Sequence, residues 1–258
     1  TIGLAFLLYE RGAITAQDTG GLDLKWGDTP AIRELLQLTA RGEGIGAWIG
    51  QGSRRLGQHF GAEEEAVQVN GLEVAYHDPR GVSGMALAYA TSPRGACHNQ
   101  SDYFFVDWGH IQPELGIDYF GRHDGPEKSA NVARHQDWRT VYNAMVMCIF
   151  ANVAPQMQVD LINAACGYRW SVEDMLRCGE RGWNMKRLIN NRLGLTAAND
   201  KLPKTLLEPF PSGGSAGFVP DLQAMLRAYY EARGWDPETG YPTRARLAAL
   251  GLDDLAAG

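Results

Sequence analysis

Residues 221–234, DLQAMLRAYYEARG, decide the fold class of this chain. Their large apolar side chains recur at the spacing i, i+3, i+4, i+7 and i+8, which places them on one face of an α-helix. Pro220-Asp221 opens the predicted helix and Gly234 ends it. The stretch predicts an amphipathic helix that packs on a core through Leu222, Met225, Leu226, Tyr229 and Tyr230.

Helical patterns recur along most of the chain. Residues 1–11 are apolar nearly all round, which predicts a buried helix, and Asp28 followed by Pro30 predicts the start of another. Further helices are expected at about 45–60, 127–153 and 171–194, and after the capping residue Thr243. The glycines within 45–60 weaken a helix, so we expect another part of the backbone to approach it closely. Pro155 is expected to end the helix at 127–153, and Ser171 to Asp174 resembles a capping box.

Two segments depart from this helical pattern. Residues 66–69 and 72–76 alternate in polarity around Asn70-Gly71, which is the strongest short signal for a β-hairpin. Residues 99–126 are polar, aromatic and interrupted by Gly and Pro, which predicts a long ordered loop with short helical pieces, often a functional feature. We therefore expect a mainly α protein with a small β hairpin near 66–76.

The composition excludes several classes of protein. The chain is 45% hydrophobic and 21% charged with a formal net charge of −6, which is typical of a globular protein. No cluster of basic residues is longer than Arg54-Arg55, so we expect no nucleic-acid partner. No apolar run approaches the length of a membrane span and no basic signal-peptide region opens the chain. The 4 cysteines are too few for a disulfide framework, which indicates reduced thiols and a cytoplasmic location.

The chain opens with Thr1 and not Met, which is typical of a fragment.

Two stretches carry residues suited to chemistry, although the standard nucleotide-binding, hydrolase and zinc motifs are missing from the sequence. Residues 91–98, TSPRGACH, place a thiol, a guanidinium and an imidazole in one turn. His98 can exchange a proton near neutral pH and Arg94 can pair with phosphate or carboxylate. The alternative is an ordinary loop in which His98 caps a backbone carbonyl.

The second stretch is residues 143–150, NAMVMCIF, which contains Cys148. A lone cysteine on a helix usually behaves as a small buried hydrophobe. An iron–sulfur cluster takes four thiolates, and the spacing of the other cysteines fits no cluster motif. Cys178, three residues after Met175, is expected to lie in the core.

Several stretches, in order along the whole chain, resemble the tungsten-pterin aldehyde ferredoxin oxidoreductases. They are DPRG at 78–81, GMALAYATS at 84–92, RGACH at 94–98, ERGWNM at 180–185, RLIN at 187–190, DKLP at 200–203, YYEARGWD at 229–236, GYPT at 240–243 and LGL at 250–252. The resemblance implies two helical domains: a truncated domain 2 at residues 1–72 and domain 3 at residues 73–258. In the family, a β domain that binds the pterins and three further cluster cysteines precede the point where this chain begins.

The resemblance also implies roles for individual residues. His98 occupies the position of the family's active-site histidine beside the metal, and Cys148 that of the cysteine that completes a four-iron, four-sulfur cluster. The cofactor-binding positions are Asn143, Met147, Gln100 and Arg94. The implied cofactors of the full-length protein are a tungsten-bis-pterin and this cluster, with none bound by the chain alone. The implied partners are ferredoxin or an equivalent electron acceptor, the N-terminal pterin-binding domain and a second subunit in a homodimer.

Three positions depart from the family pattern. Asn143 stands in place of an aspartate and keeps one acceptor without the charge. Val146 replaces a glycine, and Gln100 stands where a basic residue is common.

Two functions follow from these matches and departures. The chain is interpreted as the C-terminal part of a tungsten- or molybdenum-pterin enzyme that oxidises an aldehyde or related oxo substrate and reduces ferredoxin, and it is expected to be inactive alone. The alternative is a cofactor-free helical scaffold or interaction domain. His98 and Cys148 favour the enzyme, whereas Asn143, Val146 and Gln100 favour the scaffold.

Overall fold

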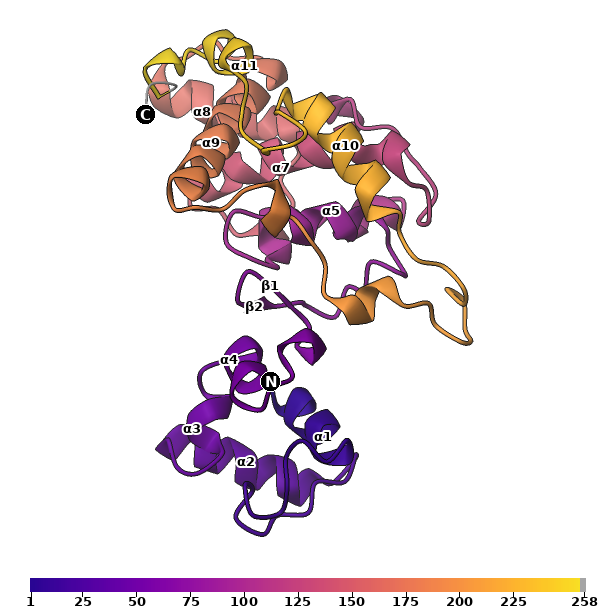
Figure 1. Cartoon of the computed structure of the whole chain (residues 1–258). Coiled ribbons are helices and arrows are strands. Elements are labelled where there is room, and N and C mark those ends of the chain that lie inside the picture. Colours follow the sequence, from indigo (N-terminus) through magenta and orange to yellow (C-terminus); the bar gives the residue numbers. More distant parts are fainter. Residues whose placement is uncertain (256–258) are drawn as a thin grey trace. The chain divides into compact units, whose positions relative to one another are not determined.

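Helices make up most of the computed structural model, which describes residues 1–255 (Figure 1). Within that range the one sheet is an antiparallel hairpin of β1 (Gln68–Val69) and β2 (Leu72–Glu73). Asn70 and Gly71 have φ of 49° and 91°, so both central residues of the turn adopt the left-handed conformation that an Asn-Gly hairpin requires. The prediction of a mainly α protein with a small hairpin is confirmed.

The chain divides into two compact units. The first unit contains residues 1–74, 94–96 and 202–208, and the second contains residues 75–93, 97–201 and those from 209 onward. The assignment of residues 1–72 and 73–258 to domains 2 and 3 of the family remains a prediction.

In the first unit, four α-helices and a 3-10 turn surround one apolar core, and the unit also contains the β1–β2 hairpin. They are α1 (Ile2–Glu10), α2 (Thr29–Arg41), α3 (Gly46–Ile49), α4 (Ser53–His59) and η1 (Glu63–Glu65). The single helix predicted at 45–60 is wrong, because Gly52 adopts a φ of 91° between α3 and α4. Gly46 shows the expected close approach: a Cβ built on it would lie 2.2 Å from the carbonyl carbon of Leu38 on α2.

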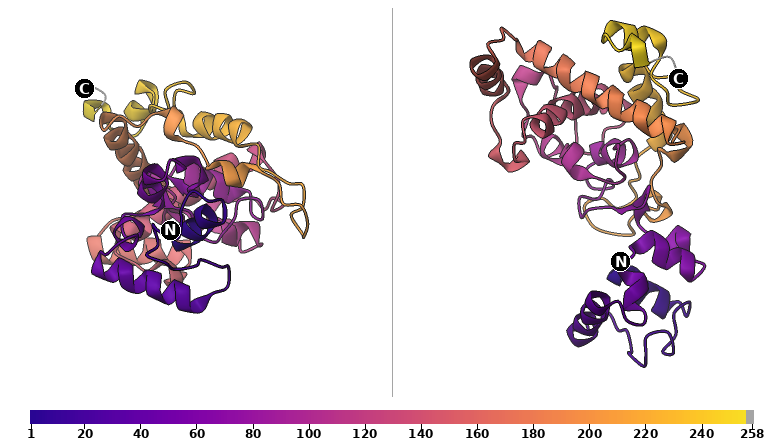
Figure 2. Two further views of the ribbon diagram at one scale, coloured as in Figure 1. Left: turned by 60° about the horizontal axis from the view of Figure 1, so that its bottom comes forward. Right: turned by 90° about the vertical axis from the view of Figure 1, so that its left-hand side faces the viewer.

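The second unit is organised around α7 (Ser129–Ala144), which packs against α9 (Val172–Arg192) and α10 (Leu222–Arg233) (Figures 1 and 2). At the α7–α9 crossing the backbones nearly touch, because a Cβ on Gly179 would lie 2.0 Å from the carbonyl oxygen of Asp137. The helix α5 (Gly84–Ala90) lies against both α7 and α10, and all of its residues are buried. The other elements of this unit are η2 (His98–Gln100), α6 (Phe104–Asp107), η3 (Pro113–Leu115), η4 (Pro126–Lys128), η5 (Ile149–Ala151), α8 (Pro155–Cys166), η6 (Ala197–Asn199), α11 (Arg244–Ala249) and η8 (Asp253–Leu255), while η7 (Lys204–Leu207) belongs to the first unit.

Most of the predicted helix ends are confirmed. The Ser171 side chain accepts a hydrogen bond from the backbone N–H of Asp174, and the Asp174 carboxylate accepts one from the backbone N–H of Ser171. These two hydrogen bonds complete the capping box of α9. Gly234 ends α10 with a φ of 63°, and Thr243 caps α11. The prediction for 127–153 is wrong, because α7 ends at Ala144 and Pro155 opens α8 instead of ending a helix.

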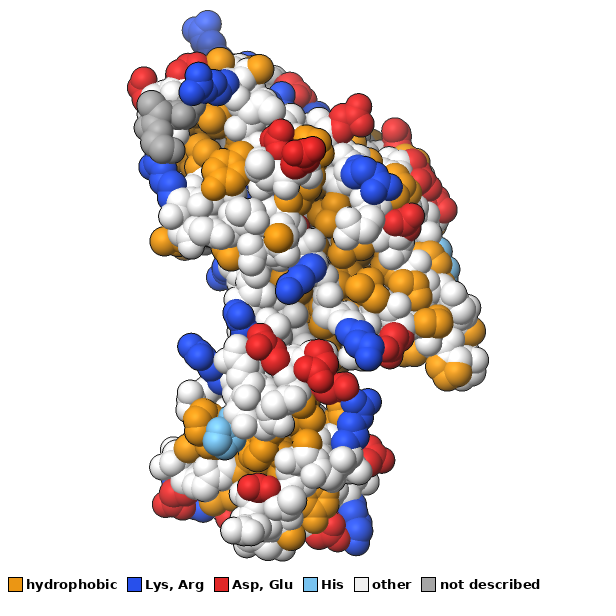
Figure 3. All heavy atoms as spheres, in the orientation of Figure 1, with side chains coloured by type: hydrophobic (Ala, Val, Ile, Leu, Met, Phe, Trp, Pro, Cys, Tyr) orange, Lys and Arg blue, Asp and Glu red, His pale blue; other side chains and the backbone are white. Residues whose placement is uncertain are grey.

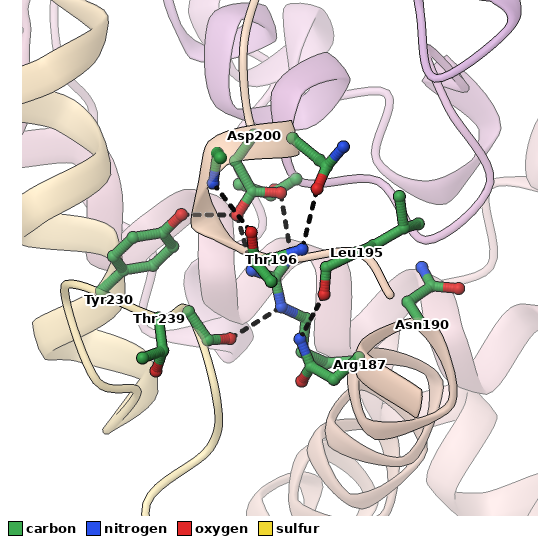
Figure 4. A network of polar contacts seen from close by, with 12 residues as sticks. Arg187, Asn190, Leu195, Thr196, Asp200, Tyr230 and Thr239 are labelled. Atoms are coloured by element: carbon green, nitrogen blue, oxygen red, sulfur yellow. Dashed lines mark hydrogen bonds and ion pairs between the residues drawn. The ribbon is translucent and has the colours of Figure 1, made fainter. Parts of the chain in front are cut away.

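A buried ion pair ties α9 to the segment that follows it (Figure 4). Arg187 donates from both Nη atoms to the two carboxylate oxygens of Asp200 at 2.8 Å, and from Nε to the carbonyl oxygen of Gly240 at 2.8 Å. The hydroxyl of Tyr230, on α10, donates to the same carboxylate. Asp200 is therefore held in the interior by charge pairing and hydrogen bonding.

The surface carries charges of both signs. On the face drawn in Figure 3, Lys and Arg side chains are interspersed with Asp and Glu side chains. Among residues 1–255, we find no helix with the length and apolar character that crossing a membrane requires.

Candidate functional site

The turn η2 presents His98 beside a second histidine that the motifs did not indicate. The ring centroids of His98 and His77 lie 5.4 Å apart, and His77 stacks on Phe104 at 3.7 Å. Burial lowers the pKa of His77, and the neighbouring His98 lowers it further. His98 is half-buried. At neutral pH an uncharged imidazole therefore stands next to His98.

Gln100, at the end of η2, is buried and paired with a cation. Its Oε1 accepts a hydrogen bond of 3.1 Å from Nζ of Lys186 on α9. The Lys186 ammonium thus brings a positive charge to Gln100, the position where the resemblance leads us to expect a basic residue. Sequence reasoning missed Lys186, because nothing in the spacing of residues 100 and 186 shows that they meet. Arg94 is exposed and belongs to the first unit.

The C-terminal end of α7 has a Schellman motif with an unusual residue at its centre. The backbone N–H of Met147 donates to the carbonyl oxygen of Tyr142 at 2.9 Å, and the backbone N–H of Val146 donates to the carbonyl oxygen of Asn143 at 3.2 Å. Val146 adopts a φ of 55°, in the left-handed region that favours glycine. Asn143 is exposed, and its amide donates to the carbonyl oxygen of Arg139 one turn earlier. Val146, which the resemblance matches to a glycine of the family, therefore holds a backbone conformation that favours glycine.

Cys148 follows this motif in an exposed loop and not on a helix. The expectation of a buried small hydrophobe is wrong for Cys148 and also for Cys178, which is exposed on α9. None of the 4 cysteines is in a disulfide, and of them Cys97 alone is buried. The neighbours of Cys148 are also exposed, Val146 to 92% and Phe150 to 78%. The loop therefore presents a thiol with apolar side chains on either side of it.

This loop can supply part of a metal–sulfur site but not a whole one. In the part of the chain that the structure describes, no group of three or more His, Cys, Asp or Glu side chains could hold a metal ion. A four-iron cluster takes four ligands, mostly thiolates. Cys148 fits the role of one such ligand because it is exposed, and the remaining ligands would come from protein outside this chain.

A buried polar network lies between η2 and α7. Nε and Nη2 of Arg139 donate to the two carboxylate oxygens of Asp102 at 2.6 and 2.8 Å. Ser101 Oγ and His135 Nδ1 share a hydrogen bond of 2.9 Å. Burial lowers the pKa of His135 to about 3, so its imidazole is uncharged at neutral pH. None of these four residues belongs to a motif that is recognisable in the sequence.

Comparison with known proteins assigns the family. A family model described as domains 2 and 3 of aldehyde ferredoxin oxidoreductase matches residues 1–252. The chain belongs to the aldehyde ferredoxin oxidoreductase family. The tungsten-containing aldehyde ferredoxin oxidoreductase of Pyrococcus abyssi is 37% identical over 265 residues, which cover 99% of this chain and 42% of that protein. The aliphatic sulfonate oxidoreductase WOR-like subunit of Pyrococcus furiosus is 28% identical and covers 98% of this chain.

The family resemblance found in the motifs is thereby confirmed, and the chain spans 42% of the length of its Pyrococcus abyssi relative. Among solved structures, the active-site complex BamBC of benzoyl coenzyme A reductase, in complex with 1,5-dienoyl-CoA, aligns with a TM-score of 0.70. It is 19% identical and covers 98% of this chain and 43% of that one, so it shows the fold alone.

Proposed function

We propose that this chain is the C-terminal part of a tungsten- or molybdenum-pterin oxidoreductase. The whole protein would oxidise an aldehyde or related oxo substrate to an acid, adding one oxygen from water and releasing two protons and two electrons. The electrons would pass through a four-iron, four-sulfur cluster to ferredoxin. The family match over residues 1–252 carries this proposal. Because the chain spans 42% of its relative, we assign the reaction to the whole protein and expect the chain alone to be inactive.

The side chains near η2 would manage the proton. The pterin-held metal would supply the oxygen-transfer and redox chemistry when bound. His98 is the proposed proton donor or acceptor, because it is half-buried and lies 5.4 Å from His77. The lowered pKa of His77 keeps that ring uncharged beside His98 at neutral pH.

The remaining predicted residues would hold the cofactors. Cys148 is the proposed cluster ligand, because its thiol is exposed just beyond α7. Asn143, Met147, Gln100 and Arg94 are the proposed pterin contacts. Lys186 joins them on the evidence of its hydrogen bond to Gln100, where its charge would suit an anionic group.

A cofactor-free helical scaffold is the second candidate. It is favoured by Asn143, whose amide donates to the backbone of its own helix, and by Val146, which places a branched side chain where the family has glycine. It predicts that the whole protein contains neither iron nor a pterin-held metal.

The two candidates are separated by cysteine variants of the protein made from its complete reading frame. The protein is purified without oxygen from cells supplied with tungstate, and iron, tungsten and visible absorbance are measured. Cys148→Ser is expected to remove the cluster absorbance and most of the iron. Cys166→Ser is the matched control, because Cys166 is also an exposed thiol.

Iron retained in full by the Cys148→Ser variant would contradict the assigned ligand. A wild-type protein free of iron and tungsten would favour the scaffold. Aldehyde-dependent reduction of ferredoxin by the wild type, lost in the Cys148→Ser variant and kept in the Cys166→Ser variant, would support the enzyme.

A further inference from the structure

In the second unit, a serine and a histidine that the proposed redox function does not use meet from distant parts of the chain. Ser215 lies in the loop that leads into α10, and His123 lies between η3 and η4. Ser215 Oγ and His123 Nε2 share a hydrogen bond of 3.4 Å. Both residues are half-buried, so small molecules can reach them. A hydroxyl within reach of an imidazole is the signature of a nucleophilic serine, and this contact is often long before substrate binds.

The imidazole of His123 is held in one orientation. Its ring stacks on that of Phe218, with the ring centroids 4.1 Å apart and the planes 12° from parallel. The backbone of Arg80 accepts a hydrogen bond from the ring. The chain beside it is also fixed, because the backbone N–H of Ser83 donates to the carbonyl oxygen of Arg122 at 2.8 Å. A neutral imidazole that donates to a carbonyl from one nitrogen accepts at the other, and Nε2 is the nitrogen that faces Ser215.

The surroundings of His123 keep this imidazole uncharged at neutral pH. Burial lowers its pKa, and the positive charge of Arg122 lowers it further. Lys128 acts in the same direction, whereas the hydrogen bond to Arg80 and the charge of Asp124 act against it without reversing the shift. An uncharged imidazole can take the proton of a serine hydroxyl, so the ring is in the form that a general base requires.

The loop that carries Ser215 is anchored and has free hydrogen-bond donors. Nη2 of Arg122 donates to the carbonyl oxygen of Gly214 at 2.6 Å, which ties this loop to the segment that carries His123. Among residues 1–255, the backbone N–H groups of Gly214 and Ser215 find no acceptor, so they are available to an oxygen that gains negative charge. A Cβ built on Gly81 would lie 4.0 Å from Ser215 Oγ, so the glycine leaves space beside that oxygen.

We propose that Ser215 and His123 form a nucleophile and a general base that hydrolyse carboxylic esters with small acyl groups. His123 Nε2 takes the proton of Ser215 as Oγ bonds to the acyl carbon. The bond between that carbon and the alcohol oxygen then breaks, and the alcohol leaves with the proton. Water hydrolyses the acyl-serine, which releases the carboxylic acid and restores the hydroxyl. No electrons are transferred and no cofactor takes part, so this activity goes beyond the redox function and is tested separately from it.

Hydrolysis of p-nitrophenyl acetate by the 258-residue chain tests the proposal. The exposed thiols are first blocked with iodoacetamide, because they also react with activated esters. Ser215→Ala is expected to lower the turnover rate about tenfold, less than a general base usually contributes because the site is open to water. Ser212→Ala is the matched control, since Ser212 is an exposed serine of the same loop, and it is expected to leave the rate unchanged.

Two further measurements identify the pair. A fluorophosphonate, which labels activated serines, is expected to modify Ser215, as located by mass spectrometry, and to modify the His123→Gln variant at least about tenfold more slowly. The rate of ester hydrolysis, read at the isosbestic wavelength of p-nitrophenol, is expected to rise with pH to a plateau. It should be half-maximal below pH 6.5, because the pKa of His123 is lowered from that value.

Three results would overturn the proposal: equal hydrolysis by the wild type and the Ser215→Ala variant, a fluorophosphonate label that is absent or lies on another residue, or a rate that rises with hydroxide concentration without a plateau. Because Ser215 lies in a surface loop, the Ser215→Ala variant keeps the test decisive even if His123→Gln fails to fold.

Discussion

Replacing Val146 by glycine is expected to stabilise the protein. Val146 holds the left-handed position of the Schellman motif that ends α7, with a φ of 55°. Side chains at such a position clash with the following carbonyl, and β-branched residues fit it worst. The side chain of Val146 is 92% exposed, so its removal leaves no cavity and gives up little buried apolar surface.

The magnitude follows from two opposing effects. Relief of the left-handed conformation is worth roughly 1–2 kcal/mol. Glycine also makes the unfolded chain more flexible, which costs about 0.4–1 kcal/mol. The central values of these two effects give a net increase in the free energy of unfolding of about 0.8 kcal/mol, or a rise in Tm of about 2 °C for a chain of this size.

The assay is urea and thermal unfolding of the Val146→Gly variant, followed by far-UV circular dichroism. Val146→Asn is a second test, because asparagine also tolerates the left-handed region. Val67→Gly is the control at a half-buried position outside that region, and it is expected to destabilise the protein by about 1 kcal/mol. A Val146→Gly variant that is no more stable than the wild type would refute the argument from backbone strain.

Three further predictions concern the interior and the thiols. Between pH 8 and pH 5 the wild type is expected to lose about 2 kcal/mol of stability through His135. The pKa of His135 is about 3 in the folded protein and near 6.5 in the unfolded chain, so a fall in pH protonates this residue in the unfolded chain alone. A His135→Gln variant with the same pH dependence of urea unfolding would contradict this. Arg187→Met is expected to lower the free energy of unfolding by about 3–5 kcal/mol, because it leaves the Asp200 carboxylate buried without its cationic partner. The Arg187→Met/Asp200→Asn double variant should recover part of that loss. If the effects of the two substitutions on the free energy of unfolding simply add, the ion pair does not have this role. With a disulfide reagent under native conditions, three thiols should react quickly and the buried Cys97 only after unfolding, whereas rapid reaction of all four thiols would show that the described burial is wrong.

The helices whose ends carry the usual residues were predictable from the sequence. The Ser171–Asp174 capping box and Gly234 each satisfy backbone groups that a helix end exposes, so local residues alone place these boundaries. The end of α7 lacks this signal, because Val146 occupies the position where glycine would have marked it. Pro155 does not mark that end either, because proline is also common in the first turn of a helix, and here it opens α8.

The candidate site was predictable only where residues lie close in sequence. His98 and Gln100 share one turn, and their motif marked them. The partners that define their surroundings come from elsewhere: Lys186 reaches Gln100 from α9, and His77 approaches His98 from the segment before α5. Such contacts depend on how helices pack, which residue spacing does not encode.

The exposure of the thiol at Cys148 also affects how the protein must be handled. An accessible thiolate reacts with oxidants to give a sulfenic acid, which condenses with a second thiol to form a disulfide. Two copies of the chain could be covalently joined in this way through Cys148 or the other exposed cysteines. A dimer seen in air without reductant would then report sulfur oxidation, so the subunit count should be taken from samples kept reduced and free of oxygen.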